Sequence, residues 1–161
     1  MKEAVLILEN LRSVENTASI FRSADGFGVS KIYLVGTTPA PLDRFGRKRA
    51  DFSKVALGAE KVISYEVSKS ISSVIKELKD QNFQILALEQ HPKSIRLKNF
   101  QTSKLKNFAL IVGSETDGVS TEALEASEAI LEIPMEGMKE SLNVSVATGI
   151  ALFHMLSGSE F

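Results

Sequence analysis

The chain has 161 residues, enough for one domain with a full core, and its 43% hydrophobic and 24% charged residues are typical of a globular protein. It has no cysteine, which excludes disulfides, thiolate chemistry and cysteine metal sites, and no apolar run approaches the ~20 residues of a membrane helix. The formal net charge of -1 argues against a nucleic-acid partner, because affinity for phosphates comes largely from Lys and Arg. The charge is uneven, however: residues 1–99 carry 16 basic and 11 acidic side chains, whereas residues 100–161 carry 3 basic and 9 acidic ones.

Short apolar segments rich in β-branched residues alternate with segments of helical periodicity along the chain. This alternation predicts an α/β fold in which a mostly parallel sheet carries helices on both faces. The predicted strands are 4–9, 31–35, 61–65, 83–88, 108–112 and 129–133. The predicted helices are 16–25, 51–57, 70–80, 121–126 and 143–156. The last helix is apolar almost all round, so we expect it to pack on the sheet and also to contact a second subunit.

A polar segment joins the first predicted strand to the first predicted helix. Asn16 begins this helix, and Arg22 follows six residues later, nearly two turns along it. Ligands of open α/β sheets bind at the carboxyl ends of the strands, so both side chains are candidates for a site. The structural alternatives are a helix cap for Asn16 and a surface cation for Arg22.

The densest group of basic residues lies between the second predicted strand and the second predicted helix. It consists of Arg44, Arg47, Lys48 and Arg49, with Lys54 and Lys61 nearby. A local patch of this kind can bind nucleic-acid phosphates whatever the total charge of the chain. The first four residues are therefore our candidates for contact with RNA, and a solvated loop is the alternative.

The fifth predicted strand ends at Gly113, and Glu115 and Gly118 follow in the next turn. A glycine here lets a ligand approach the main chain, which suits a flat adenosine. The turn is not a phosphate loop, because it lacks the Gly-Lys-Ser/Thr ending, and the glycines at 26–28 lack the third glycine and the preceding strand of a dinucleotide fingerprint. An ordinary turn with Ser120 capping the next helix is the alternative.

The last predicted strand stops at a proline, and a loop leads from it into the apolar helix. Pro134 biases Ile133 to an extended conformation and leaves main-chain carbonyls free to accept from an adenine amino group. Ser141 and Asn143 lie where the helix begins. Small polar side chains there cap free N–H groups, and the positive end of the helix favours a developing oxyanion.

Taken in order, these segments resemble the SpoU branch of the SPOUT methyltransferases, also called the TrmH family of RNA ribose 2′-O-methyltransferases. The resemblance rests on Asn16 with Arg22, on Gly113-Ser114-Glu115 with Gly118, and on Ile133-Pro134-Met135 followed by Ser141-Leu142-Asn143. It spans almost the whole chain and includes the stretch 56–60. Because the first motif begins within ten residues of Met1, we expect a single domain, 1–161, without the N-terminal RNA-binding extension that many members carry.

The resemblance implies an α/β domain with a deep C-terminal trefoil knot, working in the cytoplasm as a homodimer with its site near the subunit interface. The cofactor implied is S-adenosylmethionine, and no metal is required. Carried over by motif, the residues that hold the cofactor are Leu88, Gly113, Ile133, Met135, Ser141 and Leu142. Arg22 is then the catalytic residue, and the residues that orient the reacting groups are Asn16, Glu115, Ser141 and Asn143.

We therefore expect an enzyme that methylates a ribose 2′-hydroxyl of RNA, with tRNA favoured as the substrate and ribosomal RNA as the next candidate. One alternative is a non-catalytic RNA-binding protein with the same fold, and the retention of Arg22, Glu115, Ser141 and Asn143 argues against it. Another is a nucleotide-binding module of the flavodoxin or dehydrogenase kind, against which the incomplete glycine fingerprints count. The two histidines have no third ligand beside them in sequence, so no metal site is predicted.

Overall fold

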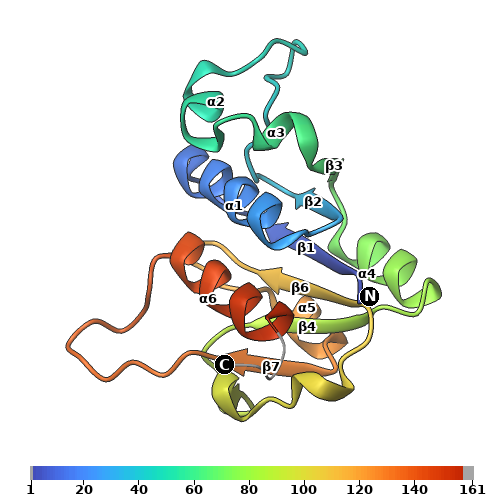
Figure 1. The fold of residues 1–161 in the computed structure, drawn as a ribbon, viewed down its shortest axis with the longest axis vertical. Coiled ribbons are helices and arrows are strands. Elements are labelled where there is room, and N and C mark those ends of the chain that lie inside the picture. Colours follow the sequence, from blue (N-terminus) through green and yellow to red (C-terminus); the bar gives the residue numbers. More distant parts are fainter. Residues whose placement is uncertain (1, 158–161) are drawn as a thin grey trace.

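A single parallel sheet forms the centre of the fold (Figure 1). The structure, a computed structural model, describes residues 2–157. Within that range the strands are β1 (Ala4–Glu9), β2 (Lys31–Val35), β3 (Ser64–Ser68), β4 (Gln84–Leu88), β5 (Ile95–Arg96), β6 (Phe108–Val112) and β7 (Ala129–Glu132). Their order is β3-β2-β1-β6-β4-β7-β5, and every neighbouring pair is parallel. The predicted parallel sheet is confirmed.

Helices cover both faces of the sheet, as predicted, and each face has its own apolar core. The helices are α1 (Val14–Phe27), α2 (Ala50–Ala56), α3 (Ala59–Val62), α4 (Ile71–Asp80), α5 (Thr121–Ala126) and α6 (Val144–Leu156), with 3-10 turns η1 (Leu97–Asn99) and η2 (Thr102–Lys104). Residues of α1, α2, α3 and α6 pack in one core with Leu6 and Leu8 of β1. Residues of α4 and α5 pack in the other with Val5 and Ile7, because successive side chains of a strand point to opposite faces.

Side-chain caps fix where the helices at the site begin. Ser13 caps α1 by accepting from the N–H of Asn16 at 3.0 Å. Ser120 caps α5 by accepting from the N–H of Ala123 at 3.2 Å, and Asn143 caps α6. Because Ser13 is the cap of α1, the side-chain amide of Asn16 is available for another partner.

The predicted strands 83–88 and 129–133 are each one residue longer than β4 and β7, the strand predicted at 61–65 is misplaced by three residues, and one strand was not predicted. The segment predicted as strand 61–65 is helical at its start, because Gly58, at φ 94°, begins α3 and the N–H of Ile63 bonds to the carbonyl of Ala59. Pairing with β2 therefore begins only at Ser64. The two-residue β5, which pairs with β7 at the edge of the sheet, had no sequence signal.

Strand order brings the polar segments of the sequence to one edge of the sheet. Val112 of β6 is in register with Leu8 of β1 on one side and with Leu88 of β4 on the other, and Leu88 is in register with Leu131 of β7. The segments that follow these four strands therefore leave the sheet side by side.

The trefoil knot does not follow from strand order alone, and it stays a prediction. No helix within residues 2–157 has both the length and the apolar character to cross a membrane.

Candidate active site

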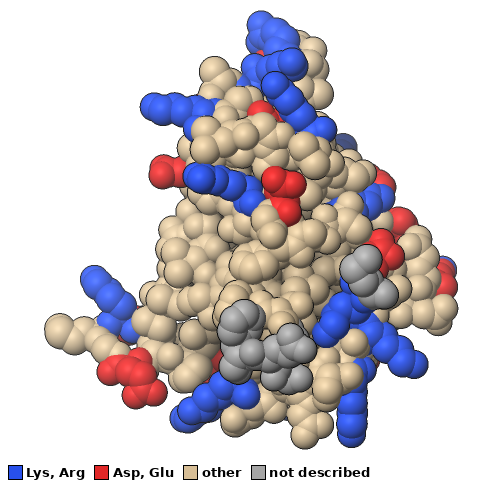
Figure 2. Space-filling model, viewed as in Figure 1, with Lys and Arg blue, Asp and Glu red and all other residues tan. Residues whose placement is uncertain are grey.

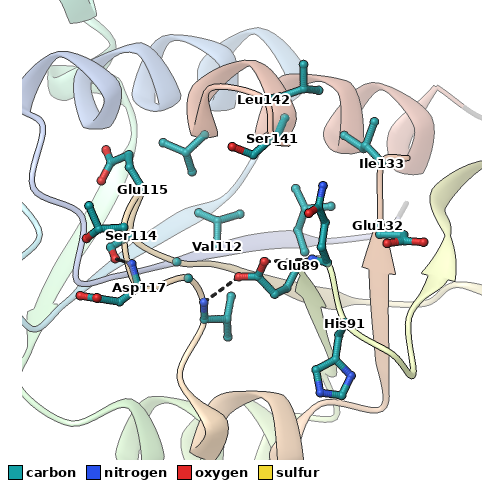
Figure 3. Close-up of a pocket in the computed structure, with 18 of the residues that line it drawn as sticks. Glu89, His91, Val112, Ser114, Glu115, Asp117, Glu132, Ile133, Ser141 and Leu142 are labelled. Carbon is teal, nitrogen blue, oxygen red and sulfur yellow. Dashed lines mark hydrogen bonds between the residues drawn. The ribbon is translucent and has the colours of Figure 1, made fainter. Parts of the chain in front are cut away.

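A cavity of about 700 Å³ opens at the carboxyl edge of the sheet, beyond β4, β6 and β7. Its volume falls in the ~300–1,000 Å³ range of ligand pockets, and its place is where open α/β sheets bind ligands. Figure 3 shows Ser114, Glu115 and Asp117 on one side and Glu132 and Ile133 on the other, with the segment before α6 above. The predicted site residues that line the cavity are Leu88, Gly113, Glu115, Ile133, Ser141, Leu142 and Asn143.

Three side chains from distant segments form a hydrogen-bonded chain at this cavity. The amide nitrogen of Asn16 donates to Oε1 of Glu115 at 2.7 Å, and the amide nitrogen of Asn143 donates to Oδ1 of Asn16 at 3.0 Å. Oδ1 of Asn143 in turn accepts from the N–H of Ser145 at 2.9 Å, which is the cap of α6. Because each amide uses its nitrogen and its oxygen for different partners, the three side chains fix one another's orientation.

The glycines after β6 allow the loop to fold back on itself. A Cβ on Gly113 would collide with the main chain of Gly118 and Val119, so no other residue fits there without a shift of the loop. Ser114 holds the turn closed, because its hydroxyl accepts from the N–H of Asp117 at 2.9 Å and its carbonyl accepts from the N–H of Gly118 at 3.0 Å. The glycine predicted to admit a ligand is thus required first by the chain's own close packing.

Residues directly after β4 line the cavity although the sequence analysis did not single them out. Glu89 accepts from the N–H of Val119 at 2.9 Å, which ties β4 to the glycine loop (Figure 3). The side chain of Gln90 donates to the carbonyl of Glu140 at 2.7 Å, which ties the same segment to the loop before α6. His91 lines the cavity as well. The signal that could have found them is their place after a strand, the rule that already pointed to Asn16 and Arg22.

Comparison with known proteins decides the family. The SpoU rRNA Methylase family matches residues 3–153. The chain belongs to this family. A tRNA (guanosine(18)-2'-O)-methyltransferase from Aquifex aeolicus is 31% identical over 152 residues, covering 94% of this chain and 68% of the relative. The 23S rRNA (guanosine-2'-O-)-methyltransferase RlmB of Escherichia coli K12 is 31% identical over 149 residues, covering 92% of this chain and 58% of the relative.

Solved structures agree with the SpoU assignment. The crystal structure of the A. aeolicus TrmH/SpoU tRNA modifying enzyme has a TM-score of 0.84 at 29% identity, with 99% of this chain and 77% of that chain covered. An AdoMet-bound rRNA methyltransferase from Sinorhizobium meliloti has a TM-score of 0.88 at 26% identity, with 100% and 59% covered. The resemblance predicted from the three segments is confirmed, and this chain spans between 58% and 68% of the two curated relatives.

The cavity of this SpoU chain has the character that an adenosine-containing cofactor needs. Leu88, Ile133 and Leu142 supply apolar walls, and the loop that starts at Gly113 supplies main-chain groups. A pocket that combines apolar walls with polar groups held in place suits a flat base and a ribose. Of the six residues predicted to hold the cofactor, Met135 alone does not line the cavity. No group of His, Asp and Glu within residues 2–157 is arranged to hold a metal ion.

Arg22 lies apart from the cavity of its own chain. Its side chain is exposed on α1, and no residue among 2–157 forms a hydrogen bond or an ion pair with its guanidinium. Two residues of the same helix, Ser19 and Ser23, line a shallow groove of about 500 Å³ between α1 and α6, and Arg22 lies beside them in sequence. On the α6 side this groove exposes Val146, at 50%, and Ile150, at 42%.

The four basic residues predicted to contact RNA lie on the loop between β2 and α2, where Figure 2 shows Lys and Arg gathered at the top of the molecule. Two of the four are paired within the loop: Arg47 with Asp43 at 2.9 Å and Arg49 with Asp51 at 3.0 Å. The backbone N–H of Arg47 is the main cause that lowers the pKa of Asp43 below its ordinary value. Arg44 and Lys48 have no ion-pair partner among residues 2–157, so they are the free cations of this loop.

Proposed function

We propose that this SpoU chain transfers a methyl group from S-adenosylmethionine to a ribose 2′-hydroxyl of RNA. The observation that carries the proposal is the chain of hydrogen bonds from Glu115 through Asn16 to Asn143, which joins three distant segments beside one cavity. The relatives from A. aeolicus and E. coli, whose names describe guanosine 2'-O-methylation, support it. So does the cavity, whose apolar walls and folded-back main chain suit an adenosine.

The chain's own residues position the ribose and stabilise its oxygen. S-adenosylmethionine supplies a methyl carbon that is activated by a sulfonium. Holding two reacting groups in the correct geometry can lower a barrier by ~7 to 11 kcal/mol, so orientation is the largest task. We assign it to Asn16, Glu115 and Asn143, which fix one another, together with the exposed hydroxyl of Ser141. Arg22 stabilises the developing alkoxide as a cation, because a guanidinium rarely gives up its proton, and the hydroxyl proton passes to a phosphate oxygen or to water.

We also propose that two copies of the chain form the working unit. Val146 and Ile150 expose apolar surface on α6, beside a groove that α1 completes, and a second copy would remove this surface from water. Arg22 lies on the α1 side of the same face and not in its own cavity, which supports a role for it at the cavity of the other subunit. Light scattering after size exclusion tests this point. We expect the native chain to be a dimer and Ile150→Glu to be a monomer, and a purely monomeric native protein would contradict the proposal.

For the substrate we propose tRNA first and ribosomal RNA second. The relatives from A. aeolicus and Borreliella burgdorferi, both named tRNA (guanosine(18)-2'-O)-methyltransferases, are 31% and 28% identical to this chain. The 31% identical relative from E. coli, named for 23S rRNA, keeps the second substrate open. The cavity accounts for the cofactor and the reacting ribose, while the choice between RNAs depends on surfaces outside it.

The test is mass spectrometry of nucleosides after the protein has been incubated with unmodified tRNA or ribosomal RNA and isotopically labelled S-adenosylmethionine. We expect a labelled 2′-O-methylnucleoside from tRNA, and no label with Arg22→Ala, which should still bind the cofactor in calorimetry. A label on a base would refute the ribose assignment. RNA binding without any label on either RNA would instead identify a non-catalytic RNA-binding protein.

A further inference from the structure

The basic loop between β2 and α2 displays an aromatic ring to solvent. Phe45 is 65% exposed, and the guanidinium carbons of Arg44 and Arg47 lie 4.7 and 5.0 Å from the centroid of its ring. A phenylalanine has no polar group to satisfy in water, so exposure of most of its surface at a loop tip is unfavourable unless something covers it. Cations beside the ring give this tip affinity for a phosphate as well as for a flat apolar face.

The tip is held rigid by one carboxylate. Oδ1 of Asp43 accepts from the N–H of Phe45 at 2.8 Å and from the N–H of Arg47 at 3.0 Å, and Oδ2 accepts from Nε of Arg47 at 2.9 Å. The N–H of Asp43 closes the turn by donating to the carbonyl of Arg47 at 2.8 Å, and Gly46 supplies the positive φ of 76° that the turn requires. Because the ring is already positioned, little ordering entropy is lost when a ligand covers it.

The loop is also anchored to the edge of the sheet where the cavity opens. The N–H of Arg49 donates to the carbonyl of Pro41 at 3.1 Å, and Leu42 and Lys48 form an antiparallel bridge. At its start, the buried hydroxyl of Thr38 lies 2.8 Å from the carbonyl of Leu8 and accepts from the N–H of Leu11 at 3.0 Å. The loop therefore rises from the carboxyl end of β2 and leads away from the cavity edge, to the top of Figure 1.

We propose that Phe45 stacks on an unpaired base of the RNA, while Arg44 and Lys48 contact its phosphates. This inference rests on the proposed function, because it assumes an RNA substrate. Arg47 and Arg49 are held by carboxylates and so shape the loop, whereas Arg44, whose guanidinium lies beside the ring, and Lys48 have no ion-pair partner among residues 2–157. Bases of a duplex already stack on one another, so the ligand that fits is a looped or single-stranded segment. The excess of cations over carboxylates favours RNA over a protein partner.

The first experiment measures binding of a short oligoadenylate and of unmodified tRNA by fluorescence anisotropy across a series of salt concentrations. We expect Phe45→Ala to weaken binding about 5- to 150-fold, the range of a lost base–aromatic stack, with the salt slope unchanged. Arg44→Ala and Lys48→Ala should each reduce the slope by about 0.7. Phe45→Tyr should bind like the native chain, whereas Phe45→Leu, which is apolar but has no ring face, should not. Val62→Ala, at a 70% exposed position of α3, is the matched control and should change nothing.

A second experiment detects the stack directly. The sequence has no tryptophan, so Phe45→Trp introduces the only indole of the chain. We expect its emission to be quenched as oligoadenylate is added, to change much less with an RNA duplex of equal length, and to stay constant in the control Val62→Trp. Equal quenching at both positions, or none at position 45, would overturn the inference.

The inference and the proposed chemistry fail in different ways. If the native chain binds RNA and Phe45→Ala weakens that binding but no RNA is methylated, the chemistry is wrong and the stack stands. If Phe45→Ala methylates RNA with native KM and kcat, the stack is wrong and the chemistry stands. Equal affinity of Phe45→Leu and Phe45→Tyr would also refute the stack on a base. That result would require an apolar contact without stacking, as a protein partner would make.

Discussion

Asn143 performs two tasks with the two ends of one side chain. Its oxygen accepts from the N–H groups of Ser145 and Val146, at 2.9 and 3.4 Å, and so caps α6. Its nitrogen donates to Asn16, which donates onward to Glu115. The same residue therefore contributes to the stability of the last helix and to the orientation of the site. Substitutions that keep the oxygen but not the nitrogen can separate the effect on stability from the effect on activity.

We predict that Asn143→Asp keeps the fold but loses methyl transfer. A carboxylate still caps α6, but it cannot donate to Asn16, and no rotation of the Asn16 amide can satisfy both Glu115 and a second carboxylate. Asn143→Ala should lose activity and, in addition, about 0.5–2 kcal/mol of unfolding free energy, the usual cost of a lost cap. Urea titration and a methyl-transfer assay check both variants. Native activity in Asn143→Asp would remove this hydrogen bond from the mechanism.

The close approach at Gly113 gives a second prediction for a single residue. Gly113→Ala places a Cβ against the main chain of Gly118 and Val119, so the loop must move. We expect the free energy of unfolding to fall by about 1–3 kcal/mol, as for other overpacked sites, and cofactor binding to weaken in calorimetry. Gly26→Ala is the control, because a Cβ there meets nothing within 4 Å and the position is helical. Equal behaviour of the two variants would show that the loop adapts without cost.

Among the elements, continuous apolar runs were predicted best. β1, β2 and β6 have the bounds that the sequence predicts, since strands buried on both faces are apolar throughout. β3 was misplaced because it lies at the edge of the sheet, is mostly exposed and has no such run. The elements that carry the site were therefore recognisable from sequence, while an edge strand and a two-residue strand were not.

Contacts within the site depend on strand order, which local patterns do not encode. Asn16 and Glu115 are 99 residues apart, and they meet because β6 inserts between β1 and β4. The sequence supplied the candidates through the family resemblance, but neither their pairing nor the contribution of Glu89 followed from spacing. Likewise, the basic loop was predicted as one patch, whereas the structure divides its cations into paired and free.

The basic loop gives a prediction about pH. The pKa of Asp43 is lowered by the N–H of Arg47, then by Phe45 and the Arg47 side chain, so the hydrogen bonds are present at neutral pH and are lost as pH falls through that lowered pKa. NMR shifts of the Phe45 and Arg47 amides should titrate together below pH 3.8, the ordinary value for this carboxyl. In Asp43→Asn this titration should vanish and the two amides should exchange faster at all pH values. An unchanged titration in that variant would assign it to another group.

At the scale of the whole molecule, the proposed catalytic arginine does not line the cavity of its own chain. The cavity lies at the carboxyl edge of the sheet, whereas Arg22 is exposed near the groove between α1 and α6. Because Arg22 lies outside the cavity of its own chain, its proposed catalytic role requires it either to move or to act on the cavity of a second copy. α1 is a continuous helix of 14 residues packed on α2 and α6, which disfavours a large movement.

Mixed dimers distinguish these possibilities. We predict that Arg22→Ala and Asn143→Asp, each inactive alone, regain activity when they are unfolded together and refolded as a mixture. In a mixed dimer the intact cavity belongs to the Arg22→Ala chain and the intact arginine to the other, so one of two sites is complete if Arg22 acts across the interface. Random pairing then restores about a quarter of the native specific activity, as follows from the symmetry of a two-fold dimer. Refolding each variant with itself is the control. If mass spectrometry detects mixed dimers but no activity returns, Arg22 acts within its own chain and must move to reach the cavity.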